Sequence, residues 1–151
     1  NVRPNSKSYA MTMDALVSLA KLKARRCVQE GGFSHDTSKN GIGELKEAET
    51  ILTYMHDLHK AGVEGVIANR VPYNILITGW TGLAGFGHQE APLKAEEVLR
   101  KMFSHKDNGV TDAGPDRLSF EKVRIPARCI VVPSATLVVV LSLTTFFNLP
   151  P

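Results

Sequence analysis

The sequence VPYNILITGW, residues 71–80, decides the fold of this chain of 151 residues. Its large apolar side chains are spaced three or four positions apart, at Tyr73, Leu76, Ile77 and Trp80. This spacing places them on one face of an α-helix. Pro72 precedes them at a position where the first turn of a helix tolerates proline. The stretch therefore predicts an amphipathic helix that buries one side.

Helical spacing of apolar residues recurs in three further segments, residues 9–20, 44–60 and 93–106. Before residue 125, no segment alternates apolar and polar residues in the way a half-buried strand does. We therefore expect an all-α fold in which residues 3–123 form about four helices in two antiparallel pairs. The side chains expected to share one core are those of Tyr73, Leu76, Ile77, Trp80, Ala95, Val98, Leu99 and Met102.

The helices are also copies of one another. The motif Ala-Glu-x-x-Leu-x-x-Met occurs at residues 48–55 and again at 95–102, and Tyr73 recurs at the same offset of 47 as Phe120. Tyr9 opens an earlier unit, whose helices are separated by an insertion within about residues 21–43. Such small units bury their apolar stripes only by stacking, so we expect an α-solenoid of two repeats and the start of a third.

These units resemble pentatricopeptide repeats, a family of helical repeats. The resemblance rests on residues 71–77, on the second helix at 94–102 with its earlier copy at 47–55, and on the Gly-Pro-Asp boundary at 114–116. It covers about residues 3–123, although both units are longer than is usual in the family. Tetratricopeptide and HEAT-type repeats remain the alternatives of similar architecture.

The resemblance implies binding of single-stranded RNA, with one base read per repeat by side chains on the helices. Carried over by position, the residues for base edges are Asn74 with Asp116 and Ala10 with Asn69, and those for base faces are Val71, Leu118 and Lys7. In the family, the pairing of Asn74 with Asp116 favours uridine. Ala10 has no polar side chain, so its unit should discriminate poorly.

The same residues also have a structural explanation. Asn74 on the first turn of a helix can bind nearby backbone, and Asp116 after Gly-Pro is a typical turn or cap former. The basic residues within 21–26 either track phosphates or form a solvated charged face. The alternative function is a helical scaffold that binds another protein along the same concave face.

Composition and spacing argue against an enzyme. The 18 basic and 15 acidic residues give a net charge of only +3, and Cys27 and Cys129 are too few for a disulfide scaffold or a cysteine zinc site. His56 and His59 lack a third metal ligand, so we expect partly exposed histidines there. We predict no cofactor and no metal. The family resemblance implies RNA processing, stability or translation in a mitochondrion or plastid.

Residues 126–151 are expected to lie outside the repeats of residues 1–125. No charged side chain follows Arg128, and Ser134–Leu149 is apolar but shorter than the roughly 20 residues of a membrane-spanning helix. A membrane anchor, a buried cap over the last helix and a wrongly translated tail are the three explanations. Because the sequence begins with Asn1, we expect the chain to be a fragment.

Overall fold

The computed structural model describes residues 3–31, 40–67, 69–107 and 114–124, which are helical without any strand. In chain order the helices are α1 (Ser6–Gln29), α2 (Ile42–Lys60), α3 (Arg70–Gly85), α4 (Ala91–Asp107) and α5 (Arg117–Arg124). The predicted all-α class is therefore confirmed for these residues. The decisive run at 71–80 lies within α3.

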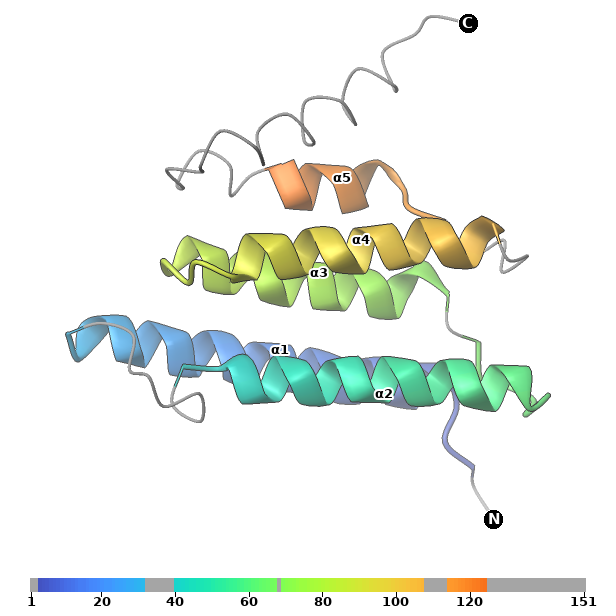
Figure 1. The fold of residues 1–151 in the computed structure, drawn as a ribbon. Helices are drawn as coiled ribbons and strands as arrows, with labels where there is room; N and C mark the ends of the chain where they lie inside the picture. Colours follow the sequence, from blue (N-terminus) through green and yellow to red (C-terminus); the bar gives the residue numbers. More distant parts are fainter. Residues whose placement is uncertain (1–2, 32–39, 68, 108–113, 125–151) are drawn as a thin grey trace, which may run out of the picture.

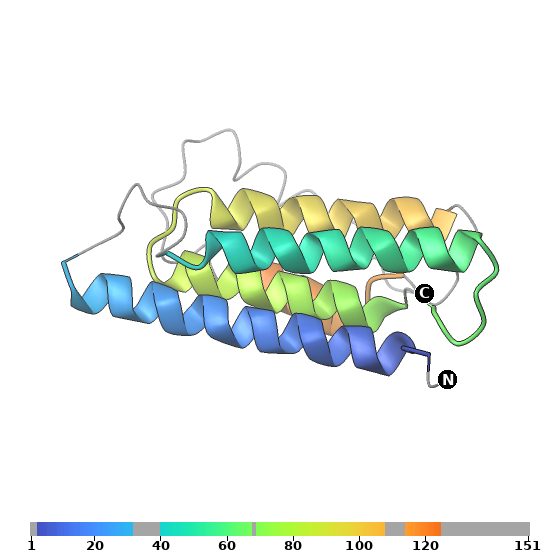
Figure 2. The same ribbon diagram turned by 90° about the horizontal axis from the view of Figure 1, so that it is seen from below.

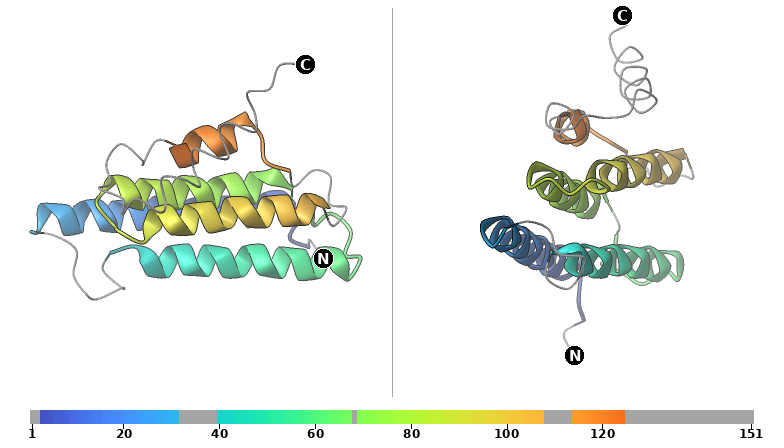
Figure 3. Two further views of the ribbon diagram at one scale, coloured as in Figure 1. Left: turned by 45° about the horizontal axis from the view of Figure 1, so that its top comes forward. Right: turned by 60° about the vertical axis from the view of Figure 1, so that its left-hand side comes forward.

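The helices are arranged as two antiparallel pairs, α1 with α2 and α3 with α4 (Figure 1). α3 packs on α1, and α5 packs on α3. As a result α1, α3 and α5 form one layer, while α2 and α4 lie beside one another in a second layer (Figures 2 and 3). The two antiparallel pairs predicted from the sequence are confirmed.

One hydrophobic core joins both pairs. All eight side chains expected to share it, from Tyr73 to Met102, belong to a single buried cluster. Trp80 is the largest of its fully buried side chains, and its Nε1 donates a hydrogen bond to Glu49 Oε1 at 2.9 Å. Each large apolar side chain buried in this way contributes about 1.5–3 kcal/mol relative to exposure.

Gly41 immediately precedes α2, has a φ of 85° and lies against α1. A Cβ atom at this position would overlap the backbone of Ala20 on α1, whose carbonyl carbon would be 2.9 Å away. Only glycine combines this left-handed conformation with so close an approach. Residues 21–29 of the expected insertion extend α1, whereas residues 32–39 lie outside the described part of the chain.

Within the described ranges, none of the helices combines the length and the apolar character needed to cross a membrane. The predicted tail at 126–151, and with it the three explanations offered for it, lies outside the described residues.

Candidate nucleic-acid interface

The first helix of each pair, and α5 after them, begins with the same arrangement of residues. The capping oxygens accept backbone N–H groups as follows: Asn5 Oδ1 from Ser8 at 3.0 Å, Asn69 Oδ1 from Val71 at 3.0 Å, and Asp116 Oδ1 from Ser119 at 2.9 Å. Asn69 and Asp116 therefore have the capping role that the structural explanation assigns to such residues. The predicted base-face positions, Lys7, Val71 and Leu118, are the second residues of α1, α3 and α5.

The structure brings Asn74 and Asp116 together through a third side chain, Ser119. The buried Ser119 hydroxyl lies 2.7 Å from Asn74 Oδ1 and 2.9 Å from Asp116 Oδ1, and its single proton is donated to one of them at a time. We call these three residues the polar cluster. Sequence reasoning missed Ser119, although its position three residues after a capping Asp is a capping-box spacing.

Asp116 carries a negative charge in this cluster. Burial alone raises the pKa of the Asp116 carboxyl, but hydrogen bonds from Ser119 and Asn74 and the positive charge of Arg70 together hold it below its usual value. Arg70 Nη1 lies 3.9 Å from Asp116 Oδ2, and the Arg70 side chain is more than half exposed. The carboxylate is thus ionised at neutral pH and offers acceptors only.

Exposed aliphatic side chains lie next to the polar cluster. Val71, one turn before Asn74 on α3, is 49% exposed, and Leu118, between Asp116 and Ser119 in the first turn of α5, is 57% exposed. Hydrogen-bonding groups thus lie within one helical turn of two exposed apolar side chains on adjacent helices.

The other predicted pair, Ala10 with Asn69, lacks such a cluster. Pro72, which has no hydroxyl, occupies the position that Ser119 holds 47 residues later. The polar contacts at this boundary come instead from Ser6, whose hydroxyl lies 3.1 Å from the carbonyl oxygens of Gly65 and Ile67. These bonds attach the loop before α3 to the start of α1. Ala10 is half-buried and Lys7 is exposed.

Two of the four basic residues within 21–26 contact other helices. The stem of Lys21 lies against Gly82 of α3, and its burial lowers the pKa of the ammonium group, with Asp14 opposing and Lys122 reinforcing the shift. Lys23 forms an ion pair with Glu44 of α2. Arg25 and Arg26 are exposed. Lys21 and Lys23 thus take part in packing within the fold, whereas Arg25 and Arg26 face solvent.

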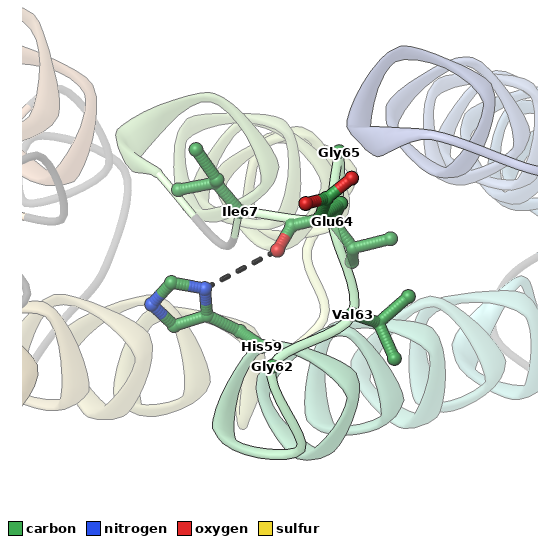
Figure 4. Close-up of a pocket in the computed structure, with 7 residues that line it drawn as sticks. His59, Gly62, Val63, Glu64, Gly65 and Ile67 are labelled. Atoms are coloured by element: carbon green, nitrogen blue, oxygen red, sulfur yellow. Dashed lines mark hydrogen bonds between the residues drawn. The ribbon is translucent and has the colours of Figure 1, made fainter.

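The two histidines of α2 have separate environments. His59 Nδ1 lies 3.3 Å from the carbonyl oxygen of Val66 and borders a small open pocket of about 270 Å³ in the loop after α2 (Figure 4). The expectation of a partly exposed side chain is confirmed for His59. It is wrong for His56, which is buried. The described part of the chain holds no group of three His, Cys, Asp or Glu side chains that could bind a metal ion.

His56 belongs to a partly buried cluster that sequence reasoning missed. The Tyr73 hydroxyl on α3 bonds both His56 Nε2 on α2 and His105 Nδ1 on α4, and the two imidazole centroids lie 4.1 Å apart. We call these residues the histidine cluster. The pKa of His56 is lowered to about 4. Burial is the largest cause, the charges of His105, Lys60 and His59 add to it, and Asp57 opposes it. Burial also raises the pKa of Tyr73 and lowers that of His105, where Lys60 and Lys101 add to it.

Comparison with known proteins gave no match, since no family model fits the chain and neither curated proteins nor solved structures showed significant similarity. The resemblance to pentatricopeptide repeats therefore stays a prediction from the sequence.

Proposed function

We propose that this chain binds single-stranded RNA and that the polar cluster reads the edge of one base. The observation that carries the proposal is the position of Asn74 and Asp116 beside the exposed Val71 and Leu118, on adjacent helices. In this proposal the helix pairs are units of an α-solenoid, and the layer of α1, α3 and α5 faces the RNA. The role in organellar RNA processing, stability or translation follows from the family resemblance alone.

The chemistry of the cluster favours particular bases. An ionised Asp116 accepts hydrogen bonds and donates none, so it prefers a base edge that carries a ring N–H. Uracil has this group at N3 and guanine at N1, whereas the corresponding nitrogens of cytosine and adenine are acceptors. The Asn74 amide can donate to a neighbouring carbonyl of the same base. These groups suit uracil and guanine alike, since both place a carbonyl beside the ring N–H, and the family resemblance favours uracil, with Val71 and Leu118 against its faces.

The test is a binding measurement with short oligonucleotides of uridine, cytidine and adenosine. We expect the native chain to prefer the uridine oligomer and the Asn74→Ala variant to lose that preference while keeping its helix content. Thr50→Ala is the control, because it also replaces a polar side chain of a helix by alanine, but Thr50 is exposed on α2 and donates to the Lys46 carbonyl of its own helix. An equal loss of binding to all three oligomers would instead make Asn74 a structural residue.

The alternative proposal, a scaffold for another protein on the same surface, gives a different result in this experiment. In that case Val71→Ala and Leu118→Ala would weaken binding of a protein partner, while RNA of every sequence would bind equally poorly. A uridine preference that depends on Asn74 would contradict the scaffold.

A further inference from the structure

An apolar stripe runs along the side of α1 that faces away from α3. Met11 is 65% exposed, Leu19 43% and Leu22 46%, and the small residues Ala15 and Ser18 between them are exposed as well. Their spacing of three and four places them on one side of the helix. We call these five residues the outer face of α1.

The outer face of α1 corresponds in register to the side of α3 that packs on α1. The capping residues Asn5 and Asn69 align the two helices with an offset of 64. With this offset Met11, Ala15, Ser18, Leu19 and Leu22 correspond to Ile75, Gly79, Gly82, Leu83 and Phe86. Among these counterparts, Gly79 and Gly82 are positions at which α3 lies against α1.

The contacts of α3 show what these positions do. A Cβ atom at Gly79 would lie 3.0 Å from Val17 of α1 and 2.6 Å from Leu45 of α2. Gly82 lies against the stem of Lys21, and Leu83 is completely buried. This side of α3 therefore packs on the preceding helix pair. Within the described residues, the corresponding side of α1 is exposed to solvent.

The chain enters α1 from the same open side. Residues 3–5 descend from the first pair, away from α3, in the way that the connection before α3 crosses from the first pair to the second (Figures 1 and 3). We propose that the outer face of α1 is the docking surface for a further helix pair of this repeat type, which precedes α1 in the same polypeptide. This proposal does not depend on RNA binding.

The size of the side chains refines the proposal. Ala15 carries a methyl group where α3 has Gly79, so a preceding pair with side chains as large as Val17 and Leu45 would collide with it. The natural occupant therefore has smaller residues at those two positions. An artificial occupant copied from this chain therefore needs Ala15→Gly in the helix that docks on it. Ser18, which stands where α3 has Gly82, meets only the flexible side chain of Lys21, which can move aside.

The test is an extended chain in which a copy of residues 3–68 is fused before Asn5 of the full chain, with Ala15→Gly in the downstream α1. We expect a monomer that unfolds at higher urea concentration than the full chain. Leu19→Glu in the downstream α1 should increase the unfolding equilibrium constant at least about tenfold. The same substitution in the upstream copy is the matched control and should have little effect, since that leucine stays exposed.

Oxidative footprinting of Met11 provides a second measurement in the same extended chain. The peptide that carries the Ala15→Gly substitution identifies the downstream copy, and we expect its Met11 to be oxidised several-fold more slowly than Met11 of the upstream copy. Equal oxidation of both copies, or equal effects of the two Leu19→Glu substitutions, would overturn the proposal. It would also be overturned if the full chain alone formed a dimer in sedimentation that Leu19→Glu dissociates, because a second copy would then occupy this face.

Discussion

Tyr73 holds the histidine cluster together because its hydroxyl can donate one hydrogen bond while accepting another. With both imidazoles neutral, one ring nitrogen accepts the phenol proton and the other donates an N–H. A single protonated imidazole is also compatible with these bonds. Two protonated rings are not, because both nitrogens then donate, the phenol proton has no acceptor, and two charges lie on rings only 4.1 Å apart.

Because of the histidine cluster, we predict that the free energy of unfolding decreases in mild acid. The pKa of His56 is about 4 in the folded chain and ordinarily 6.5, so between these values the unfolded chain binds more protons. The contribution of His56 to the free energy of unfolding is therefore fully present above about pH 6.5, and it is lost as the pH falls toward 4. We expect the free energy of unfolding in urea to be about 2 kcal/mol lower at pH 5 than at pH 7. His88 and His105, whose pKa values burial also lowers, act in the same direction.

The control for this prediction is His56→Gln, which keeps a hydrogen-bonding side chain but cannot take up a proton. We expect its loss of stability between pH 7 and pH 5 to be clearly smaller than that of the native chain. A fall of the same size in both proteins would show that other groups cause the acid sensitivity.

Ser119 is the residue whose removal should disturb the polar cluster most directly. Ser119→Ala deprives Asn74 Oδ1 and the backbone N–H of Asp116 of a buried partner. We expect a loss of about 1–2 kcal/mol in the free energy of unfolding. Ser18→Ala, at an exposed serine of α1, should change stability by less than about 0.5 kcal/mol. Similar values for the two variants would mean that Ser119 contributes little.

At the residue scale, one pairing of side chains was expected from the family resemblance, whereas contacts that depend on how the helices stack were missed. The resemblance to pentatricopeptide repeats paired Asn74 with Asp116, and in the structure both lie against Ser119. His105 was missed because its partners lie on other helices, at distances along the chain that no periodicity marks. The same holds for the contact of Ser119 with Asn74, although the capping-box spacing to Asp116 did mark Ser119. His56 was assigned to the surface because the helical stripe counts apolar residues and gives no weight to a buried hydrogen-bonded imidazole.

At the scale of elements, apolar periodicity predicted which segments are helices but not their ends. α1 extends to Gln29, beyond the stripe that suggested residues 9–20, and buries Ala24 and Cys27 in its last part. The expected insertion was located by comparing spacings between motifs, and such a comparison cannot distinguish a longer helix from a longer loop. The start of α5 was predictable, because the boundary motif before Phe120 matches the one before Tyr73.

Gly41 is the element boundary where a substitution should be most costly. Gly41→Ala adds a Cβ atom that overlaps the backbone of Ala20 and also forces alanine into a left-handed conformation. We expect a loss of about 2–4 kcal/mol, measured by urea unfolding. Gly62→Ala is the matched control, since Gly62 has a φ of 73° but open space around it, and should cost about 1–2 kcal/mol. Equal costs would contradict the close approach of α2 to α1.

At the scale of the whole molecule, the repeat offset predicted the two helix pairs and their common core because each pair must bury its stripe against the next. What stacks beyond the described helices could not be inferred from internal periodicity.

The number of base-reading sites limits the affinity of the whole chain for RNA. If each base contributes about 1–3 kcal/mol, two sites supply about 2–6 kcal/mol. We therefore expect dissociation constants weaker than about micromolar for short oligonucleotides, measured by fluorescence anisotropy.

The most direct test of base reading by the polar cluster is the ratio of uridine to cytidine affinity in the native chain and in Asp116→Asn. Asparagine caps a helix as well as aspartate does, so the fold and α5 should be retained. The substitution replaces an acceptor-only carboxylate with an amide that can also donate. We predict that the native chain prefers uridine and that Asp116→Asn lowers this ratio several-fold. An unchanged ratio, or equal affinity of the native chain for both oligomers, would contradict it.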